Sequence, residues 1–228
     1  VQGHLPQGDR AKVLFEMMKK SHDLLKNHPV NQKRVQEGKR PANSIWLWGE
    51  GMRPRLDSFQ NKFGLKGSVV SAVDLIKGIG LCAQMHSCDV EGTTGYIDTN
   101  FQGKMEAALQ ELERGQDFVY IHVEAPDECG HRNELENKVK SIGLIDRLIL
   151  QPLLKGLEKF GDYSVMILPD HPTPISTRTH ASDPVPYLIY RSNEEKESGV
   201  TCFDESQAAA TGNRIMQGHL LMPHFLQK

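Results

Sequence analysis

Apolar positions recur along the chain first with helical spacing and later as short continuous runs. Residues 11–28 place apolar side chains three and four positions apart, which predicts an amphipathic helix, and Pro29 is expected to end it. Residues 31–43 are polar and basic and predict a connector. Residues 45–48, with the sequence IWLW, predict a short strand.

After this strand the chain alternates between apolar runs and helical patterns. The runs predict strands at 68–73, 117–126, 163–171 and 185–190. The helical patterns lie at 74–85, 103–115 and 133–160. Apolar strands separated by helices indicate an α/β fold with a mainly parallel sheet covered on both faces.

The pattern at 133–160 predicts one long helix. Its apolar stripe comprises Leu135, Val139, Ile142, Leu148, Leu153 and Leu157. Pro152 lies inside this pattern and is expected to kink the helix, because proline cannot donate a backbone hydrogen bond.

Acidic and histidine side chains gather in two loops that follow predicted strands. The candidate metal ligands are Asp127, His131, Asp170, His171 and His180. Loops that leave the carboxyl ends of parallel strands meet at one edge of the sheet, so these side chains are expected to converge. A mixture of carboxylate and imidazole suits Mn²⁺ or Zn²⁺. Five ligands exceed what one four-coordinate ion needs, which favours two ions.

Other polar residues near these loops are interpreted as structural. Single acidic residues at strand ends more often cap or turn the chain, so Glu124 and Asp183 are left out of the site. His122 falls inside a predicted strand and is expected to be an ordinary packed or surface residue.

Composition limits the classes of partner. The chain has 228 residues and a formal net charge of −2, which gives no reason to expect nucleic acid or an anionic membrane as a partner. Its longest apolar runs are shorter than the roughly 20 residues of a membrane helix. The four cysteines form no Cys-x-x-Cys pair, and reduced thiols in a cytoplasmic protein are the simplest interpretation.

Several longer motifs resemble one known family. These are HVEAPDECGH, PDHPTP, THASDPVP, RPANSIWLWGEG, VSAVDLIKGIG and VEGTTGYIDTN. They are similar to motifs of the cofactor-independent phosphoglycerate mutases of the archaeal type, within the alkaline phosphatase superfamily. The resemblance implies a three-layer αβα phosphatase-like domain interrupted by an inserted substrate domain.

The resemblance also divides the ligands between two manganese ions, sometimes zinc. Asp127, His131 and His180 would hold one ion, and Asp170 and His171 would hold the other. In the family the second ion also takes an aspartate and the nucleophilic serine from near the N-terminus. Neither of those two motifs occurs here, so this chain, which begins with Val rather than Met, is expected to correspond to the C-terminal part of a longer protein.

The resemblance further implies domain limits and substrate contacts. Residues 1–65 would be the end of the inserted domain, and residues 66–228 would form most of the phosphatase-like domain. Arg53, Arg55 and Lys77 would contact a small phosphorylated substrate.

Three functions remain open at this point. The first is transfer of a phosphoryl group between the 3- and 2-positions of phosphoglycerate through a phosphoserine. The second is a homoserine kinase-like activity, because PDHPTP resembles that branch of the superfamily as well. The third is a fragment that is inert as it stands, binding one metal weakly, with the missing N-terminal segment as its partner.

Overall fold

The computed structural model describes residues 3, 5–47, 49 and 51–227. The chain divides into two compact units, Val1–Pro54 and Arg55–Lys228.

The first unit contains helices α1 (Ala11–Leu25) and α2 (Pro29–Gln36). The predicted helix is confirmed, but the predicted role of Pro29 is wrong, because this residue begins a helix. Proline suits the first helical position since its fixed φ is already helical and its missing N–H has no intrahelical partner there. The Val30 N–H also donates to the His28 side chain at 3.3 Å. Much of the predicted connector is therefore helical.

The segment after α2 is held by side chains rather than by strand pairing. The Asn31 side chain donates to the carbonyls of Leu25 and Ala42 at 2.8 and 2.9 Å and accepts from the Ala42 N–H at 2.8 Å. The strand expected at 45–48 is absent over residues 45–47, and Trp48 lies outside the described residues. Asn31 thus fixes this segment as an irregular stretch beside α1.

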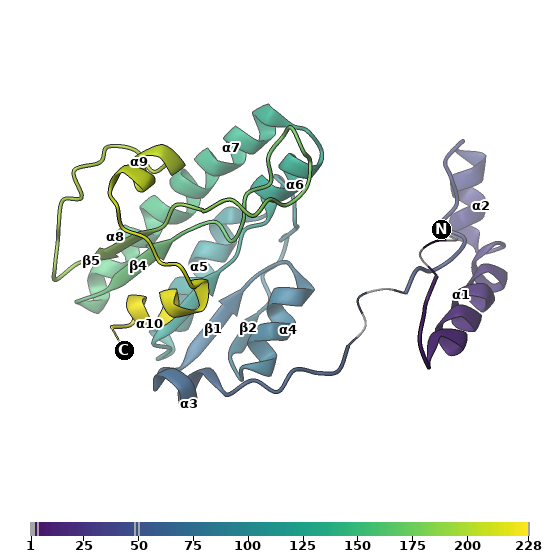
Figure 1. The fold of residues 1–228 in the computed structure, drawn as a ribbon, viewed down its shortest axis with the longest axis horizontal. Coiled ribbons are helices and arrows are strands. Elements are labelled where there is room, and N and C mark those ends of the chain that lie inside the picture. The colour runs from purple at the N-terminus through teal and green to yellow at the C-terminus, as the bar shows by residue number, and fades with distance from the viewer. Residues whose placement is uncertain (1–2, 4, 48, 50, 228) are drawn as a thin grey trace. The chain divides into compact units, whose positions relative to one another are not determined.

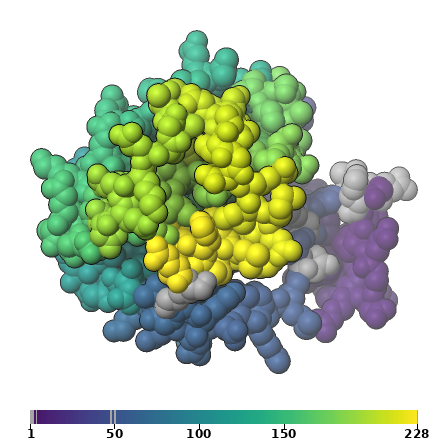
Figure 2. Space-filling model, turned by 60° about the vertical axis from the view of Figure 1, so that its left-hand side comes forward, coloured from purple at the N-terminus to yellow at the C-terminus, as the bar shows by residue number. Residues whose placement is uncertain are grey.

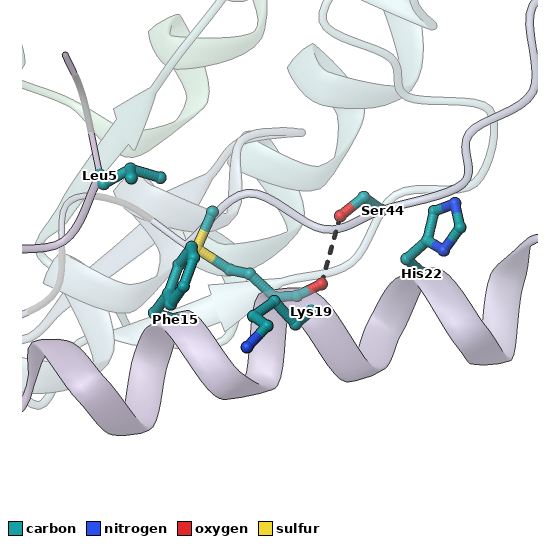
Figure 3. A pocket seen from close by; sticks show the side chains of 6 residues that line it. Leu5, Phe15, Lys19, His22 and Ser44 are labelled. Carbon is teal, nitrogen blue, oxygen red and sulfur yellow. Dashed lines mark hydrogen bonds between the residues drawn. The ribbon is translucent and has the colours of Figure 1, made fainter. Parts of the chain in front are cut away.

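A surface hollow of about 350 Å³ lies along α1 in this unit (Figure 3). It is lined by Leu5, Phe15, Met18, Lys19, His22 and Ser44. The Ser44 hydroxyl donates to the Met18 carbonyl at 3.3 Å, which brings the irregular segment against the helix.

The second unit holds two sheets (Figure 1). Strands β1 (Gly67–Val70), β2 (His86–Cys88) and β3 (Phe118–Ile121) form a parallel sheet in the order β2-β1-β3. Strands β4 (Ser164–Ile167) and β5 (Leu188–Arg191) pair antiparallel. The expected α/β class with parallel pairing is confirmed. The expectation that both site loops leave one sheet is wrong, because β4 pairs with β5 instead of joining β3.

Helices alternate with these strands as expected. They are α3 (Phe59–Phe63), α4 (Asp74–Cys82), α5 (Phe101–Glu113), α6 (Ala125–His131), α7 (Leu135–Ile145), α8 (Gln151–Leu157), α9 (Glu205–Ala210) and α10 (Leu221–Phe225), with the 3₁₀ turns η3 (Glu158–Phe160) and η4 (Gly218–Leu220). The C-terminal segment lies over one face of this unit (Figure 2).

The division by contacts falls before α3, earlier than the boundary expected near residue 65. The Phe59 ring stacks on Phe118 with a centroid separation of 4.8 Å, which joins α3 to β3. Helix α3 is thus packed with the second unit.

A hydrophobic core joins α5 to the helical segment that follows α6. Phe101, Met105, Ala125 and Ile149 are buried at its centre. Around them pack Leu109, Ile121, Val123, Leu144, Ile145, Leu148 and Leu153. This core fixes the start of α6, because Ala125 is its first residue and is 1% exposed.

The segment expected as one helix at 133–160 is interrupted by a π-helical turn, η2 (Asp146–Leu150). The turn directly precedes α8, where Pro152 removes a backbone donor. The regular α-helix is therefore interrupted by a π turn just before Pro152, and the predicted kink itself stays a prediction.

The single apolar stripe predicted along this segment is wrong. Leu135, Val139 and Ile142 on α7 are 60%, 63% and 54% exposed, whereas Leu157 is buried. A π turn inserts an extra residue, which rotates the following face by about 100° relative to an uninterrupted helix. Positions that share a face in the sequence pattern therefore lie on different faces.

Two further features agree with the sequence. Among the described residues, none of the helices has the length and apolar character required to cross a bilayer. All four cysteines, Cys82, Cys88, Cys129 and Cys202, are free thiols.

Two glycines of α4 provide a matched test of how closely this helix packs on β1. A methyl group added at Gly80 would lie 2.7 Å from Cγ2 of the buried Val69, whereas one added at Gly78 would meet no atom within 4 Å. Gly80→Ala is expected to lower the free energy of unfolding by about 1–3 kcal/mol through overpacking. Gly78→Ala should raise it by about 0.5–1 kcal/mol because alanine is the better helix former. Denaturant unfolding measures both, and equal effects would show that α4 does not lie this close to β1.

Candidate metal centre

The two predicted site loops meet at α6. Asp127 and His131 lie four residues apart on this helix, so both project from the same face. His180 comes from the long loop between β4 and β5, which runs beside α6 (Figure 1). The His131 Nε2 atom lies 3.3 Å from Asp127 Oδ2 and 3.1 Å from His180 Nε2. The His180 Nε2 atom is 3.5 Å from Asp127 Oδ1, so these three predicted ligands form one cluster.

The His131 ring is held in one orientation. Its Nδ1 lies 2.9 Å from the backbone carbonyl of Arg178, which can only accept, so the ring N–H is at Nδ1. The Nε2 lone pair therefore faces the cluster. Arg178 has a positive φ of 54°, a conformation that turns the loop and aims this carbonyl at the ring. A histidine oriented in this way by a backbone carbonyl is typical of metal ligands.

His171 lies beside the same cluster. Its ring centroid is 3.8 Å from that of His180, and ligand atoms of Asp127, His171 and His180 lie within 4.8 Å of one another. The predicted assignment of His171 to a second ion with Asp170 stays a prediction. Asp170 Oδ2 is 3.3 Å from His171 Nε2, and the Asp170 side chain is 66% exposed.

The separations in the first cluster fit a metal ion. Ligand atoms about 2.0–2.2 Å from a tetrahedral ion lie about 3.3 Å apart. His131 Nε2 is 3.1 Å from His180 Nε2 and 3.3 Å from Asp127 Oδ2, and His180 Nε2 is 3.5 Å from the other carboxylate oxygen, Oδ1. Lone pairs on two imidazole nitrogens beside a carboxylate repel one another, and a cation bound between them removes this repulsion. The residues present therefore fit a divalent metal.

Thr173 and Lys138 support this cluster, and neither was identified from the sequence. Thr173 is 4% exposed, and its hydroxyl donates to Asp127 Oδ1. The Lys138 ammonium on α7 donates to the carbonyls of Pro126 and Thr173 at 2.9 and 3.1 Å. It thereby ties the start of α6 to the β4–β5 loop. The sequence signal for Thr173 was its position between the two prolines of PDHPTP, two residues after His171.

A buried lysine approaches the carboxyl end of β3. Lys104 on α5 is 0% exposed, and its ammonium donates to the His122 carbonyl at 2.8 Å. Burial lowers the pKa of Lys104 to about 8, with Glu124 acting in the opposite direction. Lys104 was not identified from the sequence, where it is one polar residue of the predicted helix at 103–115.

His122 and Glu124 also lie near the centre. The His122 ring is 3.2 Å from the hydroxyl of the buried Ser71, and burial followed by the charge of Lys104 lowers the His122 pKa. This agrees with its interpretation as a packed residue. Carboxylate atoms of Glu124, Asp127 and Glu128 lie within 4.8 Å of one another. Burial and then the charges of Glu128 and Asp127 raise the pKa of Glu124.

The three predicted substrate contacts lie in different places. Lys77 on α4 pairs with Asp89 at 2.7 Å, just after the carboxyl end of β2. Arg53 belongs to the first unit and Arg55 to the second. Both arginines are exposed, and neither forms an ion pair with the residues that the structure describes. Their contact with substrate stays a prediction.

Known proteins are similar to this chain over nearly all of its length. Residues 11–226 match a family described as "Metalloenzyme superfamily". The chain is 49% identical over 225 residues to a Geobacter sulfurreducens protein named "Probable 2,3-bisphosphoglycerate-independent phosphoglycerate mutase", covering 99% of this chain and 56% of that protein. It is 47% identical over 223 residues to the 2,3-bisphosphoglycerate-independent phosphoglycerate mutase of Methanothrix thermoacetophila, covering 97% of this chain and 56% of that protein. The chain spans about half the length of these curated relatives.

Solved structures show the same fold. The PH0037 protein from Pyrococcus horikoshii aligns with a TM-score of 0.73 at 32% identity, covering 88% of this chain and 52% of that one. The cofactor-independent phosphoglycerate mutase from Thermoplasma acidophilum aligns with a TM-score of 0.59 at 27% identity, covering 97% and 53%. The resemblance inferred from the motifs is confirmed.

The buried Lys104 makes stability depend on pH. Because its pKa is about 8 in the folded chain and higher when unfolded, the unfolded chain binds more protons between these values. The stability of the wild type relative to Lys104→Met should therefore rise as pH increases from about 8 to about 10, by up to a few kcal/mol. Urea unfolding at several pH values measures this difference. The exposed Lys140→Met is the control, and a parallel pH dependence in wild type and Lys104→Met would contradict burial of a titrating amine.

Proposed function

The chain belongs to the metalloenzyme superfamily, and we propose that in the intact protein its metal centre serves the interconversion of 3-phosphoglycerate and 2-phosphoglycerate. The observation that carries the proposal is the cluster of Asp127, His131 and His180, in which two imidazole nitrogens and a carboxylate face one point. The names of the relatives supply the reaction.

Two divalent ions are proposed, with Mn²⁺ preferred and Zn²⁺ as the other choice. Asp127, His131 and His180 would hold one, and Asp170 and His171 would contribute to the other. When bound, such ions activate a hydroxyl nucleophile and neutralise charge on a transferring phosphoryl group. Since His171 lies against His180, the two ions would share one compact centre.

The chain's own residues prepare this centre. The Arg178 carbonyl holds the His131 ring so that Nε2 faces inward, and the Thr173 hydroxyl orients the Asp127 carboxylate. Lys138 fixes the two supporting segments against each other. These contacts hold the ligand side chains in place, which reduces the ordering cost of metal binding.

Positive charge near the carboxyl ends of the strands suits an anionic substrate. Lys77 follows β1 and Lys104 reaches the end of β3. With Arg53 and Arg55, Lys77 is proposed to contact the phosphate or carboxylate of the substrate. Lysine and arginine recognise such groups through charge-assisted hydrogen bonds.

We propose a phosphoserine as the intermediate. A serine hydroxyl attacks the phosphorus of the 3-phosphate, the bond to the 3-oxygen breaks, and that oxygen takes a proton. Glycerate then reorients, and its 2-hydroxyl takes the phosphoryl group from the serine. The serine is expected in the part of the relatives' length that this chain does not span.

The full-length protein provides the direct test. It should convert 3-phosphoglycerate to 2-phosphoglycerate with Mn²⁺ and without added 2,3-bisphosphoglycerate, as a coupled assay of 2-phosphoglycerate would show. Phosphorylation of homoserine by ATP, with no mutase activity, would favour the kinase alternative and overturn the proposal.

Substitution of a ligand separates metal binding from folding. His131→Ala in the full-length protein should lower Mn²⁺ bound per chain and reduce turnover by about a hundredfold or more. The exposed His219→Ala is the control and should change neither, with an effect on stability within about 0.5 kcal/mol. Unchanged Mn²⁺ content in His131→Ala would remove this residue from the centre.

A further inference from the structure

A second cluster of metal-ligand residues lies on β2 and α5 of the second unit and shares no residue with the centre described above. His86 and Cys88 are separated by one residue on β2, so both side chains project from the same face of the strand. Glu111 on α5 faces them, and ligand atoms of the three residues lie within 4.8 Å of one another. The topology thus brings nitrogen, sulfur and oxygen ligands together.

Position along α5 separates this cluster from the first centre. Helix α5 connects β2 to β3, which are parallel, so it runs back against the strand direction. Its residue Lys104 reaches the carboxyl end of β3, whereas Glu111 lies seven residues later, about 10 Å along the helix. Glu111 meets Ser68 and His86, which lie toward the amino ends of β1 and β2.

The distances suit a small thiophilic cation. The Cys88 Sγ atom is 3.7 Å from His86 Nδ1, close to the separation of about 3.6 Å expected between sulfur and nitrogen ligands of tetrahedral Zn²⁺. The Glu111 Oε2 atom is 2.7 Å from the same nitrogen and would have to withdraw by about 0.7 Å to admit an ion. His86 is exposed, and movement of its ring achieves this without disturbing the core.

The surroundings of Glu111 agree with a held, ionised carboxylate. Its side chain is 3% exposed and accepts hydrogen bonds from Ser68 at 2.7 Å and from Arg114 at 2.7 Å. The His86 Nδ1 atom lies 2.7 Å from Glu111 Oε2, so a bound ion would take the place of the proton between them. Oxygen Oε1 accepts from Arg114, whereas Oε2 accepts from Ser68 and also faces His86 and Cys88.

Cysteine binds a metal ion as the thiolate. Zn²⁺ and Co²⁺ displace a thiol proton when they bind, which Mn²⁺ does far less readily because it prefers oxygen ligands. The cluster therefore differs in metal preference from the Asp and His centre.

We propose that His86, Cys88 and Glu111 form a zinc-type site, with water as the fourth ligand, that ties β2 to α5. The site would join two elements that the contact between His86 and Glu111 already links. Its occupation does not depend on the function proposed for the first centre.

Cobalt titration tests the site by its sulfur ligand. Metal-free protein titrated with Co²⁺ should develop near-ultraviolet sulfur-to-cobalt charge-transfer absorption that saturates at one such ion per chain. Cys88→Ser should abolish this absorption. Cys82→Ser, which alters a thiol outside the cluster, should leave it unchanged. His86→Ala, at an exposed position, should weaken Co²⁺ binding about tenfold or more while the fold is retained.

A His131→Ala variant distinguishes metal bound at the proposed site from metal bound at the first centre. His131→Ala should keep the charge-transfer absorption, because no sulfur ligand belongs to the Asp127, His131 and His180 cluster. Zinc-edge X-ray absorption of the His131→Ala protein with one equivalent of Zn²⁺ should show one sulfur at about 2.3 Å. Absence of the band at saturating Co²⁺, or its persistence in Cys88→Ser, would overturn the proposal, whatever the outcome of the mutase assay.

Discussion

The arrangement of the site depends on one contact, that between the end of α6 and the β4–β5 loop. His131 meets the loop twice, through Nδ1 to the Arg178 carbonyl and through Nε2 to His180. Thr173 from the loop donates to Asp127 on the helix. These elements are far apart in sequence, and Lys138 fixes them together through carbonyls from both sides. Without this contact, Asp127 and His131, which follow the parallel sheet, would be separated from His171 and His180, which belong to the loop of the β4–β5 pair.

The contact reconciles an apparent difficulty in the fold. The β4–β5 pair is not hydrogen-bonded to the parallel sheet, yet its loop brings His171 and His180 beside residues that follow β3. The prolines of the loop limit its backbone conformations, so ordering it for metal binding costs less entropy. The centre is therefore positioned by loop packing on α6, and less by the common strand edge that parallel-sheet topology suggests.

Most ligands of this centre could be predicted from the sequence, because the end of a strand and the residue types that bind metals are both recognisable in a short stretch of chain. Asp127 and His131 were identified from their spacing on a helix after an apolar strand, and His180 from its proline-rich loop. Thr173 and Lys104 were missed, since a hydroxyl and a lysine acquire their roles only from neighbours distant in the chain.

The prediction of one apolar stripe at 133–160 was wrong for a related reason. The π turn before Pro152 changes which face of the helix is buried, and periodicity alone does not reveal such a turn. The pairing of His86 and Cys88 was visible as His-x-Cys, but its partner Glu111 lies 23 residues beyond Cys88.

The most direct measurement of the central claim is anomalous diffraction at the manganese edge from crystals of the full-length protein grown with Mn²⁺. A peak is expected within about 2.2 Å of an Asp127 oxygen and of Nε2 of both His131 and His180. A second peak beside Asp170 and His171 is predicted as well. Crystals that contain Mn²⁺ elsewhere but show no peak between these side chains, with His131 and His180 hydrogen-bonded to each other instead, would contradict the assignment of this metal centre.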